Sequence, residues 1–375
     1  MARLGEICAI NMGQSPDSST YNKDRNGLPF FQGNADFGEV YLMVRLWCSE
    51  PIKIAQEKDI LISVRAPIGA LNISNCKCCI GRGLAALTVN KNICIREYLW
   101  HALLSKITEL NSKGTGSTFK AINKKTLTET EIPLPSLDEQ QKIAAVLDKV
   151  NDLINKRRQQ LDKLDELVKS WFVEMFGKLG SNPKGYPSKT LAELCSKITD
   201  GKHGGCETEA GTGRFFVGAR EIYDGVVHYD TAPEITVRDF EKDYKRCNIE
   251  IGDFLIVNTG ATIGKSAIAT DERTTSTLLQ KSVALLKVRS EQMLPIFLRY
   301  CYMANPKMYM VESASAQPNL LLSKIKATTV YVPPIDQQQA FAAFVHQIDK
   351  SKSAIQKSLK KLETLKKSLM QEYFG

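Results

Sequence analysis

A glycine-bounded loop with a lysine and a serine is the first feature that could do chemistry. Residues 260–266 read Gly-Ala-Thr-Ile-Gly-Lys-Ser and resemble a phosphate-binding loop, in which backbone N–H groups and a lysine hold phosphate. That loop needs four residues between its glycines, and here there are three. Residues 65–70, which match it in the first half, contain Arg65 but no lysine. We therefore expect a turn that recurs between strands and no nucleotide site.

A nuclease site is the second chemistry that residue types alone would allow. Glu234, Asp243 and Lys245 could together hold Mg²⁺ beside a scissile phosphate. Their segment reads as a charged loop, however, and pairs of carboxylates at such spacing are common. The four histidines are dispersed and fit no His/Asp/Ser pattern, and no dinucleotide-type glycine loop is present for a methyl-donor cofactor. We expect no catalytic residue in this chain.

The cysteines do not predict a metal site. Ten are present, and the tight cluster Cys76-Lys77-Cys78-Cys79 contains one C-x-x-C. A structural zinc site normally needs a second pair of ligands, for which His203 and Cys206 in the other half are a conceivable partial partner. We expect no metal and mostly free thiols in a reducing cytoplasm, because the sequence shows neither a signal-peptide core nor a bilayer-spanning apolar run.

What remains is a surface for binding an anionic polymer. The net charge is +9 and the pI about 8.9, which favours a partner such as double-stranded DNA. Arginine and lysine suit guanine edges and phosphates, asparagine and glutamine suit adenine, and glycine-rich loops allow close approach of the backbone. The candidate DNA-binding residues are Gln14, Ser15, Tyr21, Gln32, Arg65, Arg82, Lys113, Ser117, Lys120, Lys202, His203, Arg214, Arg220, Asn258, Thr259, Lys265, Gln317 and Asn319.

The elements that would position these residues are repeated along the chain. Residues 137–177 align without a gap with residues 335–375, and 14 of the 41 positions are identical. Each copy has apolar residues at alternating steps of four and three, which predicts one long helix with a heptad seam. The seam residues are Ile143, Leu147, Val150, Leu161, Leu164 and Trp171 in the first copy, and Phe341, Val345, Ile348, Leu359, Leu362 and Leu369 in the second.

These two helices should pack on each other as a rod about 60 Å long, at 1.5 Å per residue. Prolines immediately ahead of each copy prevent an earlier start, and Gly177 ends the first. Two caps remain open for the first helix: Asp138 with Gln141, or Ser136 with Glu139. The alternative interpretation of each apolar stripe is a core-facing helix of an α-bundle.

Two β-rich heads precede the helices. The segments ahead of both helices are rich in β-branched residues, aromatics and turn formers, and they resemble each other loosely. We expect an α+β fold with an internal pseudo-twofold repeat and an antiparallel coiled coil of the two helices. The expected division is a head at 1–136, a helix at 137–177, a second head at 178–334 and a second helix at 335–375.

Several motifs resemble those of the specificity subunits of type I restriction–modification enzymes, over the whole length of the chain. They are residues 4–8 (Leu-Gly-Glu-Ile-Cys) with 12–16 (Met-Gly-Gln-Ser-Pro), residues 28–33 (Leu-Pro-Phe-Phe-Gln-Gly), and the two helix starts at 132–144 and 332–339. The chain departs modestly from the pattern, with Gln337 where Glu139 stands in the first copy and Ala340 where Lys142 stands.

This resemblance implies a function. The heads would be target recognition domains that each read half of a bipartite DNA site in the major groove, and the helices would set the distance between the half-sites. Two methyltransferase (M) subunits and restriction (R) subunits would dock on the chain. S-adenosylmethionine, Mg²⁺ and ATP would bind these partners, so that this chain carries no cofactor, is not an enzyme and needs no membrane.

Three other interpretations stay open at this stage. The chain could be the specificity subunit of a modification-only adenine methyltransferase, because restriction would lie in a separate polypeptide. It could be an endonuclease or methyltransferase in its own right, against which the missing cofactor loop argues. It could also be a coiled-coil scaffold whose heads bind protein, which salt-dependent affinity for a bipartite duplex would separate from DNA recognition.

Overall fold

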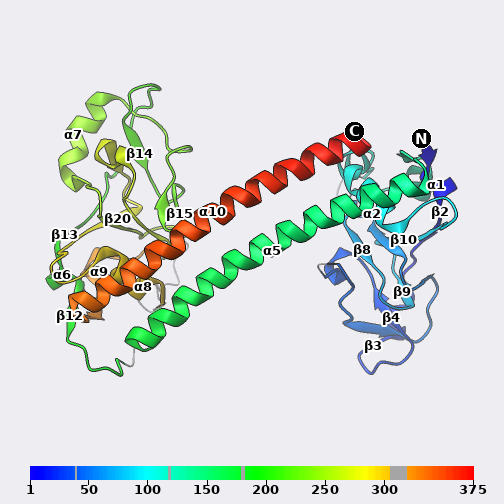
Figure 1. Cartoon of the computed structure of the whole chain (residues 1–375), viewed down its shortest axis with the longest axis horizontal. Coiled ribbons are helices and arrows are strands. Elements are labelled where there is room, and N and C mark those ends of the chain that lie inside the picture. The colour runs from blue at the N-terminus through cyan, green and yellow to red at the C-terminus, as the bar shows by residue number, and fades with distance from the viewer. Residues whose placement is uncertain (39, 117–119, 179–181, 305–318) are drawn as a thin grey trace. The chain divides into compact units, whose positions relative to one another are not determined.

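The chain forms two compact units, each with a β-rich head. The structure, a computed structural model, describes residues 1–38, 40–116, 120–178, 182–304 and 319–375. Unit 1 comprises Met1–Gln159 with Gln356–Gly375, and unit 2 comprises Gln160–Ile355. The helices α5 (Leu137–Phe176) and α10 (Ile335–Phe374) have 40 residues each (Figure 1). Each of them is divided between the two units, so that every unit contains one segment of both helices.

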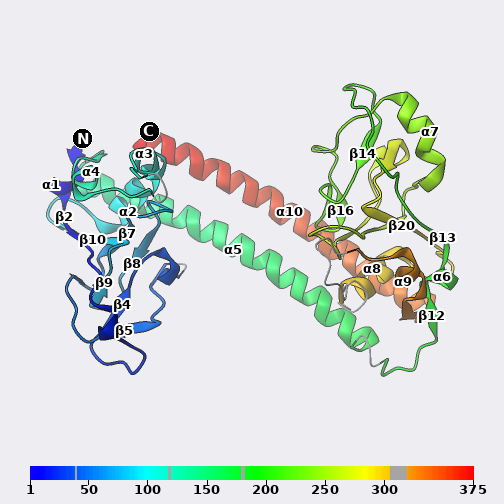
Figure 2. The same ribbon diagram turned by 180° about the vertical axis from the view of Figure 1, so that it is seen from behind.

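The head of unit 1 contains a four-stranded antiparallel sheet of order β2-β10-β7-β8 and a five-stranded sheet of order β3-β5-β4-β9-β6. In the second sheet β4 and β9 run parallel (Figure 2). The strands are β1 Ala2–Arg3, β2 Cys8–Met12, β3 Tyr21–Asn22, β4 Leu28–Phe31, β5 Leu46–Cys48, β6 Ile54–Ala55, β7 Ile60–Ser63, β8 Leu71–Ile73, β9 Cys78–Ile80, β10 Leu84–Val89 and β11 Glu131–Ile132. The helices are α1 Leu4–Ile7, α2 Arg96–Ser105, α3 Ile107–Ser112 and α4 Lys124–Thr128.

The head of unit 2 repeats this plan. Its four-stranded sheet has the order β13-β20-β17-β18, β14 and β19 form a parallel pair, and β12 pairs with β21 as β1 pairs with β11. The strands are β12 Ser188–Thr190, β13 Cys195–Asp200, β14 Phe215–Val217, β15 Ile222–Tyr223, β16 Val226–Val227, β17 Phe254–Val257, β18 Ser266–Ile268, β19 Thr277–Leu279, β20 Val283–Val288 and β21 Thr329–Tyr331. The helices are α6 Leu191–Leu194, α7 Val237–Cys247, α8 Pro295–Ala304 and α9 Leu322–Ala327.

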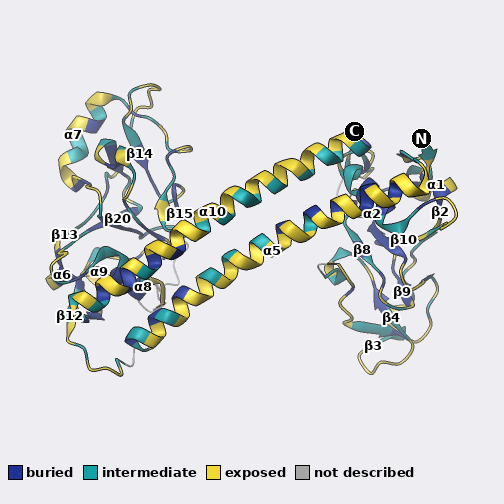
Figure 3. Cartoon of the chain, viewed as in Figure 1, coloured by how far each residue is buried: buried dark blue, intermediate teal, exposed yellow. Residues whose placement is uncertain are grey.

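Within each unit the two long-helix segments pack on the head and on each other. In unit 1, Ile143 and Leu147 of α5 share a core with Phe374 of α10 and with α2. In unit 2, Phe172 of α5 and Phe341 of α10 share a core with α8, and Figure 3 shows short buried stretches in dark blue between exposed ones in yellow along both long helices. The expected α+β fold, with an internal repeat and antiparallel pairing of the long helices, is confirmed.

The seam residues differ in how deeply they lie. The buried ones are Ile143, Leu147, Val150, Phe341, Val345 and Ile348, and the half-buried ones are Leu161, Leu164, Trp171, Leu359, Leu362 and Leu369. Five of the buried residues, all except Val150, belong to the core that a head forms with the helices. Three of the half-buried ones, Leu164, Trp171 and Leu369, pack against the edge of such a core. Depth within these cores therefore separates most of the two groups.

The first turn of α5 settles the choice of cap. The backbone N–H groups of Glu139 and Gln140 donate to the side-chain and carbonyl oxygens of Ser136, at 3.4 and 2.9 Å. Asp138 lies inside the helix, so the alternative that makes it the cap is wrong. At the other end Gly177 has a φ of 84° and donates to the carbonyl of Val173 at 2.8 Å, which is a conformation that glycine adopts without strain.

A buried glutamine locks each helix start to its head. The amide nitrogen of Gln140 donates to the carbonyls of Ile93 and Pro135 at 3.1 and 2.9 Å, and its oxygen accepts from the N–H of Ile95 at 2.9 Å. Gln338 makes the same three bonds in unit 2, to Gln292, Pro333 and Leu294, at 3.1, 2.9 and 2.9 Å. Both glutamines are fully buried, so they satisfy backbone groups that water cannot reach.

Replacing either locking glutamine by alanine should lower the free energy of unfolding of its unit by about 2–4 kcal/mol, since each orphaned backbone group costs about 1–3 kcal/mol. Chemical denaturation of the single variants measures this loss. Gln141→Ala and Gln339→Ala are matched controls, because these neighbouring glutamines are exposed. Equal stability of the locking and control variants would show that the three bonds contribute nothing.

A buried histidine joins α2 to α5 in unit 1. Nε2 of His101 lies 2.7 Å from Oδ1 of Asp148, and the histidine side chain is 1% exposed. Burial lowers the pKa of His101 below its usual value, even though Asp148 favours the charged form. The unfolded chain therefore binds a proton near pH 6.5 that the folded chain does not take up until the pH is lower.

This histidine should make unit 1 less stable in acid. Its contribution to stability is complete above about pH 6.5 and is lost as the pH falls toward the lowered pKa. Thermal melts between pH 7 and 5 should show a smaller decrease for His101→Gln than for the unchanged chain. His203→Gln, at an exposed histidine, should not alter the profile; an identical decrease in both variants would contradict this assignment.

The segment expected as a charged loop is instead the helix α7, so that expectation was wrong. The Oγ1 of Thr236 accepts from the N–H of Asp239 at 3.3 Å, and Asn248 ends the helix with a φ of 50°. A side-chain oxygen at the N-cap, an acidic residue in the first turn and basic residues in the last turn all stabilise a helix. The carboxylates weighed as possible Mg²⁺ ligands have other partners: Glu234 accepts from the N–H of Gly213 at 3.0 Å, and Asp243 pairs with Lys202.

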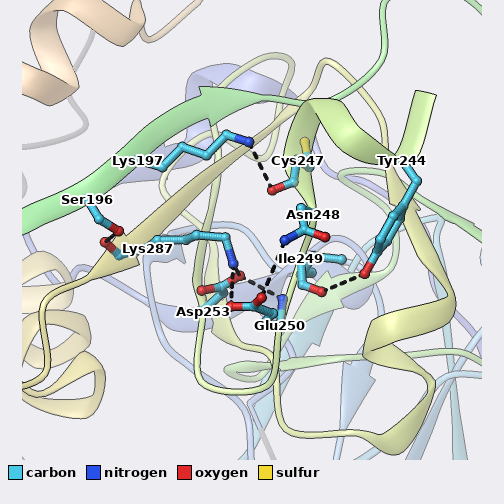
Figure 4. Close-up of polar contacts among 9 residues, drawn as sticks. All are labelled: Ser196, Lys197, Tyr244, Cys247, Asn248, Ile249, Glu250, Asp253 and Lys287. Carbon is cyan, nitrogen blue, oxygen red and sulfur yellow. Dashed lines mark hydrogen bonds and ion pairs between the residues drawn. The ribbon is translucent and has the colours of Figure 1, made fainter. Parts of the chain in front are cut away.

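The chain that leaves α7 is fixed to the sheet by a lysine. Figure 4 shows Nζ of Lys287 between Glu250 at 2.8 Å and Asp253 at 3.0 Å, with the Tyr244 hydroxyl donating to the carbonyl of Ile249 at 3.1 Å. Burial raises the pKa of the Asp253 carboxyl although the lysine lies beside it. These contacts hold α7 against the four-stranded sheet of unit 2.

Candidate functional site

Distant segments of the unit 1 head meet at one set of turns, which we call the junction. It comprises residues 13–15, 32, 64–66, 80–83 and 120–122. Backbone bonds join them: the N–H of Gln14 donates to Ile80 at 3.0 Å, that of Gly83 to Gln32 at 3.2 Å, and that of Val64 to Gly83 at 2.9 Å. The N–H of Arg82 donates to Oγ of Ser15 at 3.2 Å, and that of Ala66 to the carbonyl of Lys120 at 3.1 Å.

Unit 2 builds the same junction from residues 201–202, 218, 258–259, 279–282 and 319–320. The N–H of Lys202 donates to Leu279 at 2.7 Å, as Gln14 does to Ile80. The N–H of Asn258 donates to Ser282 at 3.0 Å, as Val64 does to Gly83. The N–H of Leu320 donates to Asn258 at 2.7 Å, as Ile122 does to Val64 at 2.9 Å. The backbone frame is therefore repeated.

A glycine at the start of each junction leaves room for the turn beside it. A Cβ at Gly13 would lie 2.1 Å from the carbonyl oxygen of Gly81, and a Cβ at Gly201 would lie 2.2 and 2.3 Å from those of Leu279 and Gln280. Real Cβ atoms do not approach oxygen so closely. Only glycine therefore fits here, for reasons of space.

The junction of unit 1 gathers most of the candidate residues of that head. Gln14, Gln32, Arg65, Arg82 and Lys120 are exposed, and Ser15 is half-buried. Among the described residues the three cations form no ion pair. Tyr21 is close by, because its hydroxyl donates to the carbonyl of Pro16 at 2.9 Å while its ring stacks on Phe30 with centroids 4.5 Å apart. Burial raises the pKa of this hydroxyl.

Two remaining candidates of this head have other surroundings. Lys113 is exposed but bonds to Glu109 at 2.6 Å, so its charge is partly neutralised. It precedes the short ladder in which Thr115 and Ala121 pair, which places it next to the junction. Ser117 lies outside the described residues.

In unit 2 the junction gathers a different set of side chains. Lys202 and Thr259 are half-buried, and His203 and Asn319 are exposed. Lys202 pairs with Asp243, which raises the lysine pKa, and His203 lies 3.1 Å from Asp200. Oγ1 of Thr259 donates to Oδ1 of Asn319 at 3.2 Å.

The other candidates of unit 2 are less uniform. Asn258 is 4% exposed and so contributes mainly its backbone. Arg220 and Lys265 are exposed and lie on turns that adjoin the junction. Arg214 lies at the far end of β14, with its guanidinium 4.7 Å above the ring of Phe240 and bonded to Oγ of Ser276 at 2.9 Å. Gln317 lies outside the described residues.

Sequence reasoning missed Lys281, which is exposed and follows β19 as Arg82 follows β9. Its N–H donates to the carbonyl of Lys202 at 2.9 Å. The signal was weak, because residues 81–84 (Gly-Arg-Gly-Leu) align with residues 280–283 (Gln-Lys-Ser-Val) only when four more residues are inserted after Gly264, in addition to the one ahead of it. A shared positive charge is weak evidence when its neighbours differ.

The residues of the glycine-bounded loop do not fit a nucleotide. The N–H groups of Ile263 and Lys265 donate to the carbonyls of Gly260 and Thr262, at 3.3 and 3.2 Å, and that of Gly264 donates to the last residue of β17 at 3.2 Å. These groups are therefore not free to hold phosphate. Residues 63–70 form the corresponding turn in unit 1, where Gly69 and Ser63 bond at 2.9 Å. The turn is structural in both heads.

The cysteines lie in strands and cores. Cys78 and Cys79 are buried in β9, and burial raises the pKa of the Cys78 thiol to about 12. Within the described ranges, no three histidine, cysteine or carboxylate side chains are grouped as a metal ion would need. Every helix in these ranges is too short or too polar to span a lipid bilayer.

Comparison with known proteins identifies the family. The family described as "Type I restriction modification DNA specificity domain" matches residues 1–163 and 183–367. The chain belongs to this family. The match covers both heads and most of both long helices, so the resemblance predicted from the two helix starts is confirmed.

Relatives within the family carry consistent names. A putative type I restriction enzyme MjaX specificity subunit of Methanocaldococcus jannaschii is 44% identical over 160 residues, which are 43% of this chain and 38% of that protein. The chain thus aligns with less than half of that relative's length. The EcoBI specificity subunit of Escherichia coli is 21% identical over 362 residues, covering 88% of this chain and 70% of that protein. The crystal structure of an S subunit from M. genitalium has the same fold, with a TM-score of 0.62 at 15% identity, covering all of this chain and 95% of that one.

Proposed function

We propose that this type I specificity-family chain is the DNA-reading, non-catalytic specificity subunit of a restriction–modification enzyme, and that each head reads one half of a bipartite duplex site. The repeated junction carries the proposal. A reader of two different half-sites needs one docking frame and two sets of reading side chains. The backbone bonds of the junction recur in both heads, while Gln14 and Arg65 in unit 1 give way to Lys202 and Thr259 in unit 2.

The charge of the junctions suits a polyanion. Arg82 and Lys281 occupy the same turn in the two heads and are exposed. Neither forms an ion pair within the described part of the chain. Such cations contact phosphate and fix the orientation of the duplex, whereas glutamine, asparagine and arginine side chains read base edges. Division of the chain into target recognition domains at 1–136 and 178–334, with spacer helices at 137–177 and 335–375, is part of this proposal.

Identical exposed residues at the two helix starts support a pair of like partners. Asp138, Gln141 and Ala145 lie on one exposed face of α5, and Asp336, Gln339 and Ala343 repeat them on α10. Because these residues are exposed, core packing does not explain why they are identical in the two helices. Two methyltransferase subunits would dock there, and restriction subunits would join them. S-adenosylmethionine, Mg²⁺ and ATP would bind those partners, in the cytoplasm.

The electrostatic part of the proposal has a direct test. Arg82→Ala with Lys281→Ala should weaken binding to duplex DNA and lower the slope of log affinity against log salt by about 1.8, since each phosphate contact contributes about 0.9. Fluorescence anisotropy of a labelled duplex at several salt concentrations measures both quantities.

A matched control removes the same charge elsewhere. Lys91 and Arg289 are exposed and follow β10 and β20 at the ends that point away from the junctions. The double variant Lys91→Ala/Arg289→Ala should therefore leave the salt dependence of the affinity unchanged. An equal change in both double variants would mean that general charge, and not the junction, binds DNA. Affinity that does not respond to salt in the unchanged chain would favour the protein-scaffold interpretation.

A further inference from the structure

Each parallel strand pair is followed by a glutamine on one strand and a glycine on the other, and the two heads have these residues on opposite strands. In unit 1, β4 pairs with β9 so that Phe31 lies opposite Ile80, and the next residues are Gln32 and Gly81. In unit 2, β14 pairs with β19 so that Val217 lies opposite Leu279, and the next residues are Gly218 and Gln280. One glutamine and one glycine thus follow each pair, on opposite strands.

Space explains why each glutamine faces a glycine. A Cβ at Gly81 would lie 3.0 Å from Cα of Gln32, 3.2 Å from its Cγ and 3.2 Å from Cζ of Phe30. The Cγ contact disappears when residue 32 is glycine, and the other two need a shift of only a few tenths of an ångström. A Cβ at Gly218 would lie 2.4 Å from Oε1 of Gln280. The glutamine side chain of each head therefore occupies room that its cross-strand neighbour leaves vacant, and the two heads place a glutamine at the same point of the junction.

The surrounding backbone is the same in both heads. The N–H of Gly81 donates to the carbonyl of Phe31 at 2.8 Å, and the N–H of Gln280 donates to Val217 at 2.8 Å. The cation of each turn follows directly: Arg82 comes after Gly81, and Lys281 comes after Gln280. A base-reading amide and a phosphate-binding cation would therefore stand side by side in each head.

The chemistry of these side chains indicates their ligand. Gln32 is exposed and Gln280 is half-buried, and neither amide group forms a hydrogen bond within the described ranges. An amide offers one acceptor and one donor in a plane, which matches the N6 and N7 edge of adenine in the major groove. We infer that Gln32 and Gln280 are the matched specificity-determining residues of the two heads, each reading an adenine in its half-site. This inference rests on the proposed function.

Selection from a randomised duplex pool by the immobilised full-length chain tests it. Gln32→Ala should reduce the preference for adenine at one position of one half-site by about 5- to 150-fold, the discrimination expected of a bidentate pair. Gln280→Ala should do the same at one position of the other half-site. Gln56→Ala, at an exposed glutamine outside the junction, should select the unchanged site.

The exchange itself offers a rescue that loss of folding could not imitate. Gln32→Gly should lose the preference, and adding Gly81→Gln should restore it, because the second substitution rebuilds in unit 1 the arrangement found in unit 2. Unchanged selection by Gln32→Ala and Gln280→Ala, with the split site retained, would overturn the inference and leave the proposed function intact. If the unchanged chain selects no split site, the proposed function fails as well.

Discussion

Replacing Phe341 by alanine should lower the free energy of unfolding of unit 2 by about 3–5 kcal/mol, the cost of removing a large buried aromatic side chain. Phe341 is fully buried, and its ring centroid lies 5.4, 5.6 and 5.1 Å from those of Phe172, Phe176 and Tyr300. These rings come from α5, α8 and α10, so the cavity would open where both long helices meet the head.

Hydrogen exchange resolved along the chain measures this loss, because it reports the stability of each unit separately. Leu167→Ala is the control: Leu167 lies on α5 in the same unit and is 46% exposed, so it should cost less than about 1 kcal/mol. If Phe341→Ala costs no more than Leu167→Ala, the aromatic cluster is not the core that joins the helices to the head.

The second large effect concerns the glycines that open the junctions. Gly13→Ala and Gly201→Ala would each force a Cβ to within 2.1 or 2.2 Å of a backbone oxygen, at a cost of about 1–3 kcal/mol of strain. Each should also disable one half-site. Since joint binding of two half-sites gains about 10²–10⁴ in affinity over either alone, binding to a bipartite duplex should fall by about that factor.

Gly33→Ala and Gly205→Ala are matched controls within the same two heads. A Cβ at either position meets nothing within 4 Å, so both variants should bind as the unchanged chain does. Anisotropy measurements on one bipartite duplex compare the four. If Gly201→Ala binds as tightly as Gly205→Ala, the junction of unit 2 does not contact DNA.

The long helices could be predicted from sequence because their signals are local. The prolines ahead of Leu137 and Ile335 and the glycine at position 177 fix where a helix can begin and end, and the heptad pattern supplies the rest. The cap at Ser136 was one of two equal alternatives, since Asp138 offers the same chemistry two residues later. Only the residue at which the helix begins, which the structure shows, decides between these two caps.

The junction could not be predicted in this way, because its partners are remote in sequence. Val64 meets Gly83 and Ile122 through backbone bonds, and backbone groups leave no trace in residue type. The exchange of glutamine and glycine also hid the repeat. Gln32 aligns with Gly218, and Gly81 aligns with Gln280, so the residue types differ at both positions although a glutamine side chain fills the same place in each head. Helix α7 was missed because its residues are mostly charged, and the cap at Thr236 was not considered.

The most direct test of the central claim is to express this chain with the methyltransferase subunit of its own system in a methylation-free host, and to map N6-methyladenine by single-molecule sequencing. We expect methylation at one split motif that disappears when this chain is omitted. Methylation that is absent with both proteins, or unchanged without this chain, would contradict its role as the reader of the DNA sequence.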